Sequence, residues 1–491
     1  MNLYDLFAEN VRRRPDNPAI IAARPQRRLT YRELDDAIRT AGDQLKRAGL
    51  KRGECVGLHS GSGADYIILT YAVWSCGGCV VPIAPELAPP EKQEICRDIA
   101  MQHVISGAVG ASFVEPFRRG ADVKLFAGAH VTPVTAARDI PAGLAAVDAA
   151  FIRFTSGTTG ASKGVVLSHE TIRARVEAAN AVLHIGPDDR VVWLLSMSYH
   201  FAVTIAGYLS LGATILLPAN HFAPALLETA RGHGATLIYG SPAHLSWLAE
   251  AKDAAPIPSL RLAVSTTASL PSATGDKFRR QFELPITQAL GIIEVGLPFI
   301  NVDGGERPGS VGRLLPAYEL RLRDVGFGAN VGEVLLRGPG LLDAYYQPWR
   351  TRTEIMPDGW FHTGDVGELD ADGCLSLRGR TKDLINVLGM KFFPQEVESV
   401  LAQHPQVAAA CVMAKADERM GEVPVARVVP RGIAGPTLET ELLALCRTHL
   451  AAYKAPAQIE FVAELRRTAS GKLLRRDAAP PVEVLCDARE S

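Results

Sequence analysis

Phe154-Thr-Ser-Gly-Thr-Thr-Gly-Ala-Ser-Lys-Gly-Val165 is the most distinctive segment of this 491-residue chain. It holds five hydroxyl side chains, three glycines and a lysine between two apolar runs. Glycines let successive backbone N–H groups turn inward around an anion, and the hydroxyls with Lys163 add donors and charge suited to a polyphosphate. The spacing is not that of a Walker A loop. The stretch therefore indicates either another kind of phosphate-binding loop or a plain serine- and glycine-rich loop.

Working outward, short apolar runs alternate with helical periods. The runs begin at Cys55, Val80, His103, Thr236 and Leu262, and the clearest helical periods cover residues 31–48 and 224–233. This alternation predicts an α/β fold with parallel sheets and helical crossovers. Residues 191–219 carry no charge and are long enough to cross a bilayer. Because polar residues interrupt them, a buried strand, a helix and a second strand explain them better, so no membrane span is expected.

The pattern changes near residue 309. Short alternating strands with glycine turns continue to residue 378 and predict a small β-barrel. A boundary follows at 379–383, and beyond it we expect helices at 394–403 and 438–449 with a strand at 408–413. We therefore predict a large N-terminal domain over 1–379, built of two βαβ-type subdomains plus the barrel. A small α+β domain over 380–491 follows it.

Composition narrows the classes of function. The net charge is −1, with 52 basic and 53 acidic residues, so a general nucleic-acid or membrane-surface role is not expected. Small-molecule chemistry becomes the expectation. Residues 1–15 form a charged amphipathic pattern without the apolar centre of a signal peptide, which predicts a cytoplasmic protein.

Seven further segments stand in a fixed order around the first. They are 29–34 (Leu-Thr-Tyr-Arg-Glu-Leu), 78–83, 332–340, 359–365, 379–383, 394–398 with the preceding Gly389, and 467–473. Together with 154–165 they resemble the signature motifs of the acyl-adenylate-forming superfamily. That superfamily includes acyl- and aryl-CoA ligases, peptide-synthetase adenylation domains and luciferases, and the resemblance is closest to the acyl- and aryl-CoA ligases. The matches run through nearly the whole chain.

The resemblance implies a nucleotide site. Its expected members are Thr155, Ser156, Gly157, Thr158, Thr159, Gly160, Lys163, Thr266, Leu290, Asp365 and Arg380. Asp365 would accept hydrogen bonds from the ribose hydroxyls. Glu294 would hold Mg²⁺ together with Thr155, since magnesium prefers oxygen ligands and substrate phosphates.

The resemblance also implies a catalytic set of Lys472, Glu294 and His200. Lys472 would place its ammonium where charge develops as the carboxylate attacks the α-phosphate. The C-terminal domain would be mobile and swing about a hinge at Lys382. It would then bring Gly389 to the active site to form a tunnel for a thiol.

Four residues depart from the family pattern. Leu290 stands where an aromatic residue is usual beside adenine, and Ile293 replaces a hydroxyl expected at the α-phosphate. Thr266 and Thr267 replace two glycines. A hydrogen bond to a charged group is worth about 1.5–3 kcal/mol, so the replacement by Ile293 predicts slower adenylation.

The expected acyl pocket is formed by His200, Phe201, Val203, Thr267, Gly291, Ile292 and Leu297. Its residues are mostly apolar, which favours an acid with an apolar chain or ring. Between Arg190 and Glu228 there is no acidic residue to pair with a substrate ammonium. An unpaired buried ammonium would be very unfavourable, which argues against α-amino acids.

The sequence thus predicts an AMP-forming carboxylic acid:CoA ligase that uses ATP, Mg²⁺ and CoA, acting as a monomer or homodimer. A carrier-protein phosphopantetheine is the alternative acceptor. A catalytically weak nucleotide-binding regulator, motivated by Leu290 and Ile293, is the alternative of another class. An oxidoreductase is disfavoured because Tyr66 falls where Gly57-Leu-His-Ser-Gly-Ser-Gly63 would need its last glycine.

Overall fold

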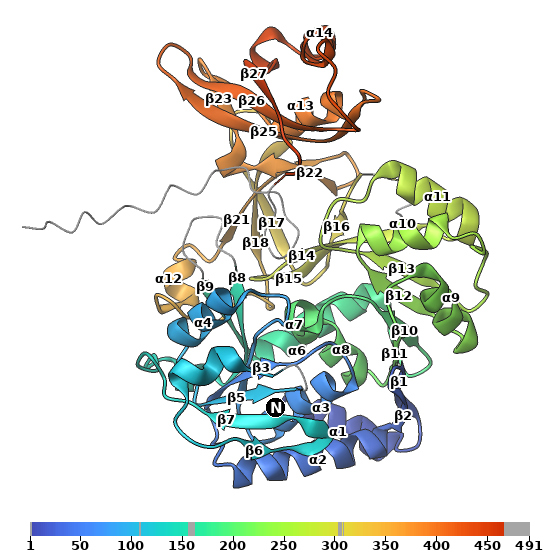
Figure 1. The fold of residues 1–491 in the computed structure, drawn as a ribbon, viewed down its shortest axis with the longest axis vertical. Coiled ribbons are helices and arrows are strands. Elements are labelled where there is room, and N and C mark those ends of the chain that lie inside the picture. The colour runs from blue at the N-terminus through green and yellow to red at the C-terminus, as the bar shows by residue number, and fades with distance from the viewer. Residues whose placement is uncertain (1, 108–109, 156–162, 303–306, 308, 466–491) are drawn as a thin grey trace, which may run out of the picture.

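Three β-sheets organise the part of the chain that the structure describes (Figure 1). The computed structural model describes residues 2–107, 110–155, 163–302, 307 and 309–465. The fold is α/β, with a large N-terminal part built on two mixed sheets and a smaller C-terminal domain built on the third. The predicted fold class is confirmed.

The first sheet has thirteen strands, and its central strands are parallel. In spatial order they are β17 (Glu319–Asp324), β18 (Val331–Arg337), β21 (Phe361–Leu369), β22 (Cys374–Arg380), β16 (Gly312–Leu314), β15 (Gly296–Asn301), β14 (Ile286–Ile292), β13 (Leu262–Ser265), β12 (Leu237–Gly240), β10 (Arg190–Trp193), β11 (Thr214–Leu217), β1 (Pro18–Ala23) and β2 (Gln26–Thr30). The strands predicted for the β-barrel pair with one another and also continue this sheet, because β16 pairs with β15.

The second sheet has nine strands, of which β8, β4, β3 and β5 run parallel. In order they are β20 (Arg350–Thr351), β19 (Ala344–Tyr345), β9 (Lys163–Ser168), β8 (Ala149–Thr155), β4 (Cys79–Pro82), β3 (Cys55–His59), β5 (His103–Ser106), β7 (His130–Pro133) and β6 (Val123–Lys124).

Helices connect and cover these two sheets (Figure 1). They are α1 (Leu3–Arg13), α2 (Tyr31–Arg47), α3 (Ala64–Ser75), α4 (Pro89–Asp98), α5 (Leu144–Val147), α6 (His169–Leu183), α7 (Met197–His200), α8 (Ile205–Ser210), α9 (Ala223–Gly232), α10 (Pro242–Glu250), α11 (Ser272–Phe282) and α12 (Arg352–Ile355), with short 3₁₀ turns η1 (Ser112–Phe117), η2 (Phe126–Gly128) and η3 (Phe201–Val203). Helix α3 is apolar on all sides and its Tyr66, Tyr71 and Trp74 are fully buried. They join one core cluster with residues of both sheets, such as Phe151 and Trp193.

The third sheet belongs to the C-terminal domain. It contains β24 (Met390–Phe392), β23 (Ile385–Val387), β26 (Gly421–Pro430), β25 (Val407–Asp417) and β27 (Gln458–Phe461), with helices α13 (Pro394–Leu401) and α14 (Leu438–His449) and the turn η5 (Ala452–Lys454). These elements enclose a core of their own that includes Phe392, Val397 and Leu442. The turn η4 (Thr381–Asp383) separates this sheet from β22.

Most predicted elements are present at the expected places. Residues 31–48 and 438–449 form α2 and α14, and the uncharged stretch 191–219 folds as β10, α7, η3, α8 and β11. In the part of the chain that the structure describes, no helix is both long and apolar enough to span a bilayer. The predicted strand 408–413 is part of a longer strand, β25.

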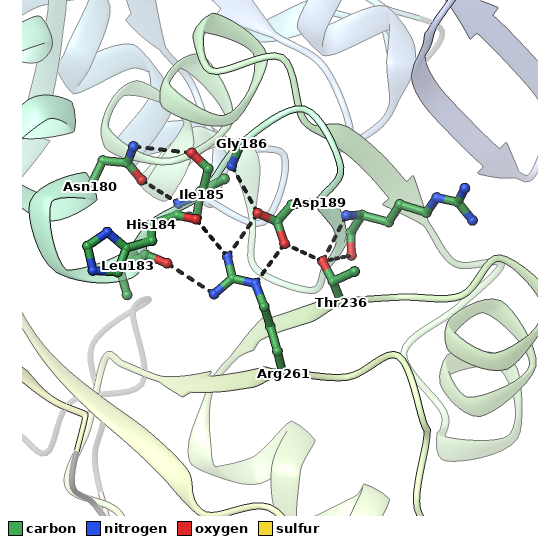
Figure 2. A network of polar contacts seen from close by, with 9 residues as sticks. Asn180, Leu183, His184, Ile185, Gly186, Asp189, Thr236 and Arg261 are labelled. Carbon is green, nitrogen blue, oxygen red and sulfur yellow. Dashed lines mark hydrogen bonds and ion pairs between the residues drawn. The ribbon is translucent and has the colours of Figure 1, made fainter.

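A polar network ties the first sheet together where several parallel strands begin (Figure 2). Asp189 is buried before β10 and accepts hydrogen bonds from Arg261 Nε and Nη2 at 2.9 and 2.8 Å, from Thr236 Oγ1 at 2.6 Å and from the Gly186 amide at 2.9 Å. Arg261 also donates to the Leu183 carbonyl at 3.1 Å, at the end of α6. Burial alone would raise the pKa of Asp189, but these hydrogen bonds outweigh it and lower the pKa.

We expect Asp189→Asn to lower the free energy of unfolding by about 1–2 kcal/mol, because it removes the charge that binds Arg261. This expected loss of unfolding free energy is modest because the Arg261 side chain is 40% exposed, so that solvent screens the ion pair. Since the folded-state pKa is lowered, the stabilisation is fully present above the ordinary aspartate pKa of about 3.9 and is lost as the pH falls through the lowered value. Thermal unfolding of both proteins at several pH values measures this.

Asp16→Asn is the matched control, because the Asp16 side chain is 82% exposed in its pair with Arg32. It should leave the melting temperature almost unchanged. Equal effects of the two substitutions would contradict the role given to Asp189.

Candidate active site

The β8–β9 hairpin carries the ends of the glycine-rich segment. Thr155 ends β8 and Lys163 begins β9, and the two are paired in register. Ser156, Gly157, Thr158, Thr159 and Gly160 lie outside the described residues. Lys163 Nζ lies 4.9 Å from the centroid of the Tyr345 ring, a cation–π contact between β9 and β19.

Glu294 lies in the turn between β14 and β15 and meets the same tyrosine. The Tyr345 hydroxyl donates to Glu294 Oε1 at 3.2 Å, and the Glu294 carbonyl accepts from the Leu342 amide at 2.7 Å. Burial, and then the Glu294 carboxylate, raise the pKa of Tyr345, so its hydroxyl keeps its proton. The structure therefore brings Lys163 and Glu294, 131 positions apart in the sequence, to one side chain.

Arg175 on α6 fixes the backbone beside Glu294. This residue is 3% exposed, and its guanidinium donates to the Gly340 carbonyl at 2.6 Å and to the Ile293 carbonyl at 2.9 Å. Burial lowers its pKa to about 10, so it stays charged at neutral pH. Sequence reasoning missed Arg175. Arg175 could have been recognised from its helical spacing, because it lies beside Ile172 and Val176 on the buried face of α6.

A second arginine, partly buried, was also missed. Arg153 stands within the apolar strand β8, with its guanidinium 5.4 Å from the centroid of the Tyr199 ring. Burial lowers its pKa to about 10, so this side chain is charged as well. In the sequence, Arg153 could have been recognised as unusual because it is the only charged residue in the apolar run Ala149-Ala-Phe-Ile-Arg-Phe.

The expected acyl residues before β11 lie on α7 and η3. His200 ends α7, is half-buried, and its carbonyl accepts a hydrogen bond from Thr204 Oγ1. Burial, and then the charge of Arg153, lower the pKa of His200 to about 3, so its imidazole is neutral in the physiological range. Phe201 is fully buried against Tyr66, Tyr71 and Trp74. It therefore belongs to the aromatic core, and Val203 follows in η3.

The other expected acyl and adenine residues gather around β13, β14 and β15. Thr266 is 4% exposed and donates from Oγ1 to the Ala289 carbonyl at 3.0 Å. The face of Gly291 adjoins Thr266 Oγ1 and Leu297. Leu290, Ile292 and Ile293 are partly buried against the same core cluster. The segment from Leu290 to Leu297 and the end of β13 thus form one continuous wall.

Thr267 has a φ of +81°, in the left-handed region that favours glycine. A β-branched residue there is strained, since its Cβ crowds the neighbouring backbone. Thr267, which replaces a glycine of the family pattern, therefore also has a backbone conformation suited to glycine, and it was predicted to line the acyl pocket.

Asp365 and Arg380 face each other across β21 and β22. They are register partners, and Arg380 Nε lies 2.7 Å from Asp365 Oδ1. Buried Glu333 on β18 supports β21 beside Asp365, because its Oε1 accepts from the Gly364 amide at 3.3 Å. The two residues assigned to the nucleotide are therefore brought together.

The C-terminal residues lie elsewhere. Lys382 is in η4, and Gly389 forms the β23–β24 turn with a φ of +86°. Gly389 lines a cavity with Gly326, Phe327 and Lys454, at the contact between the C-terminal domain and the loop after β17. Of the described residues around that cavity, none belongs to the expected acyl pocket. Lys472 lies outside the described residues.

The donors near Glu294 fit Mg²⁺ bound through substrate. Within the described ranges, no group of three or more His, Cys, Asp or Glu side chains gathers to hold a metal. Glu294 offers a single carboxylate, which shares Tyr345 with Lys163 of the β8–β9 hairpin. One carboxylate combined with substrate phosphates is how proteins commonly bind magnesium.

This fold and arrangement define a class of protein. Residues 7–346 match the AMP-binding enzyme family and residues 396–472 match the AMP-binding enzyme C-terminal domain. The chain belongs to this family, within the acyl-adenylate-forming superfamily. It is an ATP-dependent, AMP-forming ligase, and the predicted resemblance is confirmed.

Similar proteins act on diverse acids. The indoleacetate–CoA ligase of Aromatoleum aromaticum is 29% identical, with 92% of this chain and 93% of that protein covered. The sulfoacetate–CoA ligase of Cupriavidus necator is 30% identical, with 96% of each covered. Among solved structures, the amide bond synthetase McbA of Marinactinospora thermotolerans aligns with a TM-score of 0.80 at 28% identity, covering 95% of this chain and 97% of that one.

Two neighbouring threonines give a matched test of the wall. We expect Thr267→Gly to raise stability by a few tenths to about 1 kcal/mol, because relief of the left-handed strain exceeds the added chain entropy. Thr266→Gly should lower it by about 1–3 kcal/mol, because a buried hydrogen bond is lost and glycine adds entropy. Urea unfolding of the three proteins measures both, and equal destabilisation by the two variants would refute the strain at Thr267.

Proposed function

We propose that this enzyme is a carboxylic acid:CoA ligase that activates an acid with an apolar fatty or aromatic body. It forms an acyl-adenylate from ATP and then an acyl-CoA thioester. The observation that carries the proposal is the meeting of Lys163 and Glu294 at Tyr345, because it sets a cation and a metal-binding carboxylate beside the phosphate-loop hairpin. Glu294 itself lies within the segment from Leu290 to Leu297 that forms the wall.

In the first half-reaction the carboxylate of the acid attacks the α-phosphate of ATP, and pyrophosphate leaves. Lys163 and the segment 155–160 bind the departing phosphates, Asp365 and Arg380 bind the ribose, and Thr266 and Leu290 border the adenine. Lys472 stabilises the charge that develops in the transition state. Glu294 and Thr155 would hold Mg²⁺, which supplies charge neutralisation at the phosphates. The protein contributes mainly positioning and electrostatics.

In the second half-reaction the C-terminal domain rotates about Lys382. The rotation withdraws Lys472 and carries the Gly389 turn from its place beside Gly326 to the active site. A thiol then attacks the acyl carbonyl and AMP leaves. The position of Lys382 in η4, between β22 and the third sheet, supports it as the hinge and supports a domain boundary near residue 380.

CoA is the acceptor that the relatives favour. Two of them, the indoleacetate and sulfoacetate ligases, share CoA although their acids differ widely. A carrier-protein phosphopantetheine presents the same thiol and is the alternative acceptor. The preference for an apolar acid rests on Ile292, Leu297 and the neutral His200, and on the lack of acidic residues between Arg190 and Glu228.

The proposal predicts pyrophosphate release that depends on ATP, Mg²⁺ and an acid. A panel of fatty, benzoic, cinnamic and α-amino acids should give release with members of the first three classes and none with amino acids. Adding CoA should give a thioester visible by mass spectrometry. Formation of acyl-AMP without a thioester would point to a carrier protein as the acceptor. If neither the wild type nor the Ile293→Thr variant releases pyrophosphate with any acid, the nucleotide-binding regulator is favoured.

Ile293→Thr should speed adenylation by about 10- to 100-fold, because it restores one hydrogen bond to a charged phosphate. Single-turnover formation of acyl-AMP measures this rate. Ile292→Thr is the matched control, since the neighbouring residue is assigned to the acid and not to the phosphate. It should change the KM for the acid without the same gain in rate. Equal gains would contradict the assignment of Ile293.

A further inference from the structure

Arg153 is a charged residue that the proposed reaction does not use. It occupies the only charged position in β8, whose other residues from Ala149 to Thr155 are alanine, aromatic, isoleucine or threonine. Alternate residues of a strand share a face, so Arg153 lies on the same side as Phe151, which belongs to the core between the two large sheets. A strand so placed favours an apolar residue, and the guanidinium therefore requires an explanation.

The surroundings of Arg153 do not neutralise it. Among the described residues the Arg153 side chain makes no ion pair and no hydrogen bond, and its buried Nε has no acceptor. Its close partner is the Tyr199 ring at 5.4 Å, and a cation–π contact satisfies none of the N–H donors. Arg175 provides a comparison within the same chain, because that equally charged side chain donates to two backbone carbonyls.

The neighbouring groups leave a net positive charge. His200 is close enough for Arg153 to lower its pKa further, and it is neutral. Glu294 attracts Arg153 but lies beyond ion-pair distance, and its carboxylate accepts from Tyr345. Tyr66 and Tyr199 also contribute to the field around Arg153 and are uncharged at neutral pH. An uncompensated charge on a partly buried side chain whose Nε is buried is unfavourable, and an anion bound there would remove that penalty.

The position of Arg153 indicates whether the anion belongs to the acid or to the triphosphate. Its side chain lies with Tyr199 and His200, next to the expected acyl residues of η3. It stands two residues before Thr155, which places its Cα about 7 Å along the strand from the start of the phosphate loop. An oxyanion here could come from the acid or from the triphosphate, and the contacts with α7 favour the acid.

We propose that Arg153 binds a second anionic oxygen group of the acid substrate, a carboxylate or a sulfonate at the end of its otherwise apolar body. This inference rests on the proposed ligase function and narrows its substrate class to acids with two anionic groups. A guanidinium binds such groups through paired, charge-assisted hydrogen bonds. A site that offers such donors discriminates strongly against an analogue that lacks the acceptor, because the donors then stay unpaired.

The test compares matched acids of equal body, benzoate with isophthalate and terephthalate, and octanoate with suberate. Pyrophosphate release by the wild-type enzyme should give a kcat/KM at least on the order of 10-fold higher for one diacid than for its monoacid. Arg153→Met should abolish or invert this preference, and Arg153→Lys should retain part of it. Arg52→Met is the control, because the Arg52 side chain is 84% exposed, and it should change neither value.

Binding gives a second readout that does not need catalysis. The preferred diacid should raise the melting temperature of the wild-type protein and not that of Arg153→Met. If the wild type prefers the monoacids, the inference is overturned while the ligase function stands. If Arg153→Met raises the KM for ATP and keeps the acid preference, the anion is a phosphate and the inference is overturned. If no acid gives pyrophosphate, the proposed function fails, and the thermal shift by the diacids alone decides the role of Arg153.

Discussion

The carbonyl oxygens of Ile293 and Gly340 both accept hydrogen bonds from the buried guanidinium of Arg175. Through this contact α6 fixes the β14–β15 turn and the segment that leads into β19. Glu294 lies in that turn, and its own carbonyl accepts from Leu342 in the same segment. Tyr345, which contacts both Glu294 and Lys163, follows three residues later. The meeting of the two large sheets at the candidate site therefore depends on one arginine that touches no expected substrate atom.

The charged side chains of the site differ in the protein groups that they contact. Asp365 pairs with Arg380, Glu294 accepts from Tyr345, and Lys163 lies over an aromatic ring. Each thus has a protein partner that a nucleotide could replace or share. Arg153 has only the Tyr199 ring among the described groups, and this difference is why its charge points to a ligand and not to a structural role.

The residues that depart from the family pattern also differ in their contacts and backbone conformation. Thr266 satisfies its hydroxyl on the Ala289 carbonyl, so this replacement of glycine adds a hydrogen bond to the wall. Thr267 retains a backbone conformation suited to glycine and bears strain instead. Leu290 and Ile293 pack against the core with their apolar side chains, which adds buried surface where the family places polar or aromatic contacts with the nucleotide.

The α/β class, helices such as α2 and α14, and the family could be predicted from the amino-acid sequence. Those features depend on local periodicity and on motifs read within a few residues. The sequence did not reveal Arg175, whose acceptors lie 118 and 165 positions away, or Tyr345, which is 51 positions from Glu294. It also did not show that Phe201 is core or that the strands of the predicted barrel continue the first sheet. These are non-local contacts, and only the tertiary structure decides which distant side chains share one buried space.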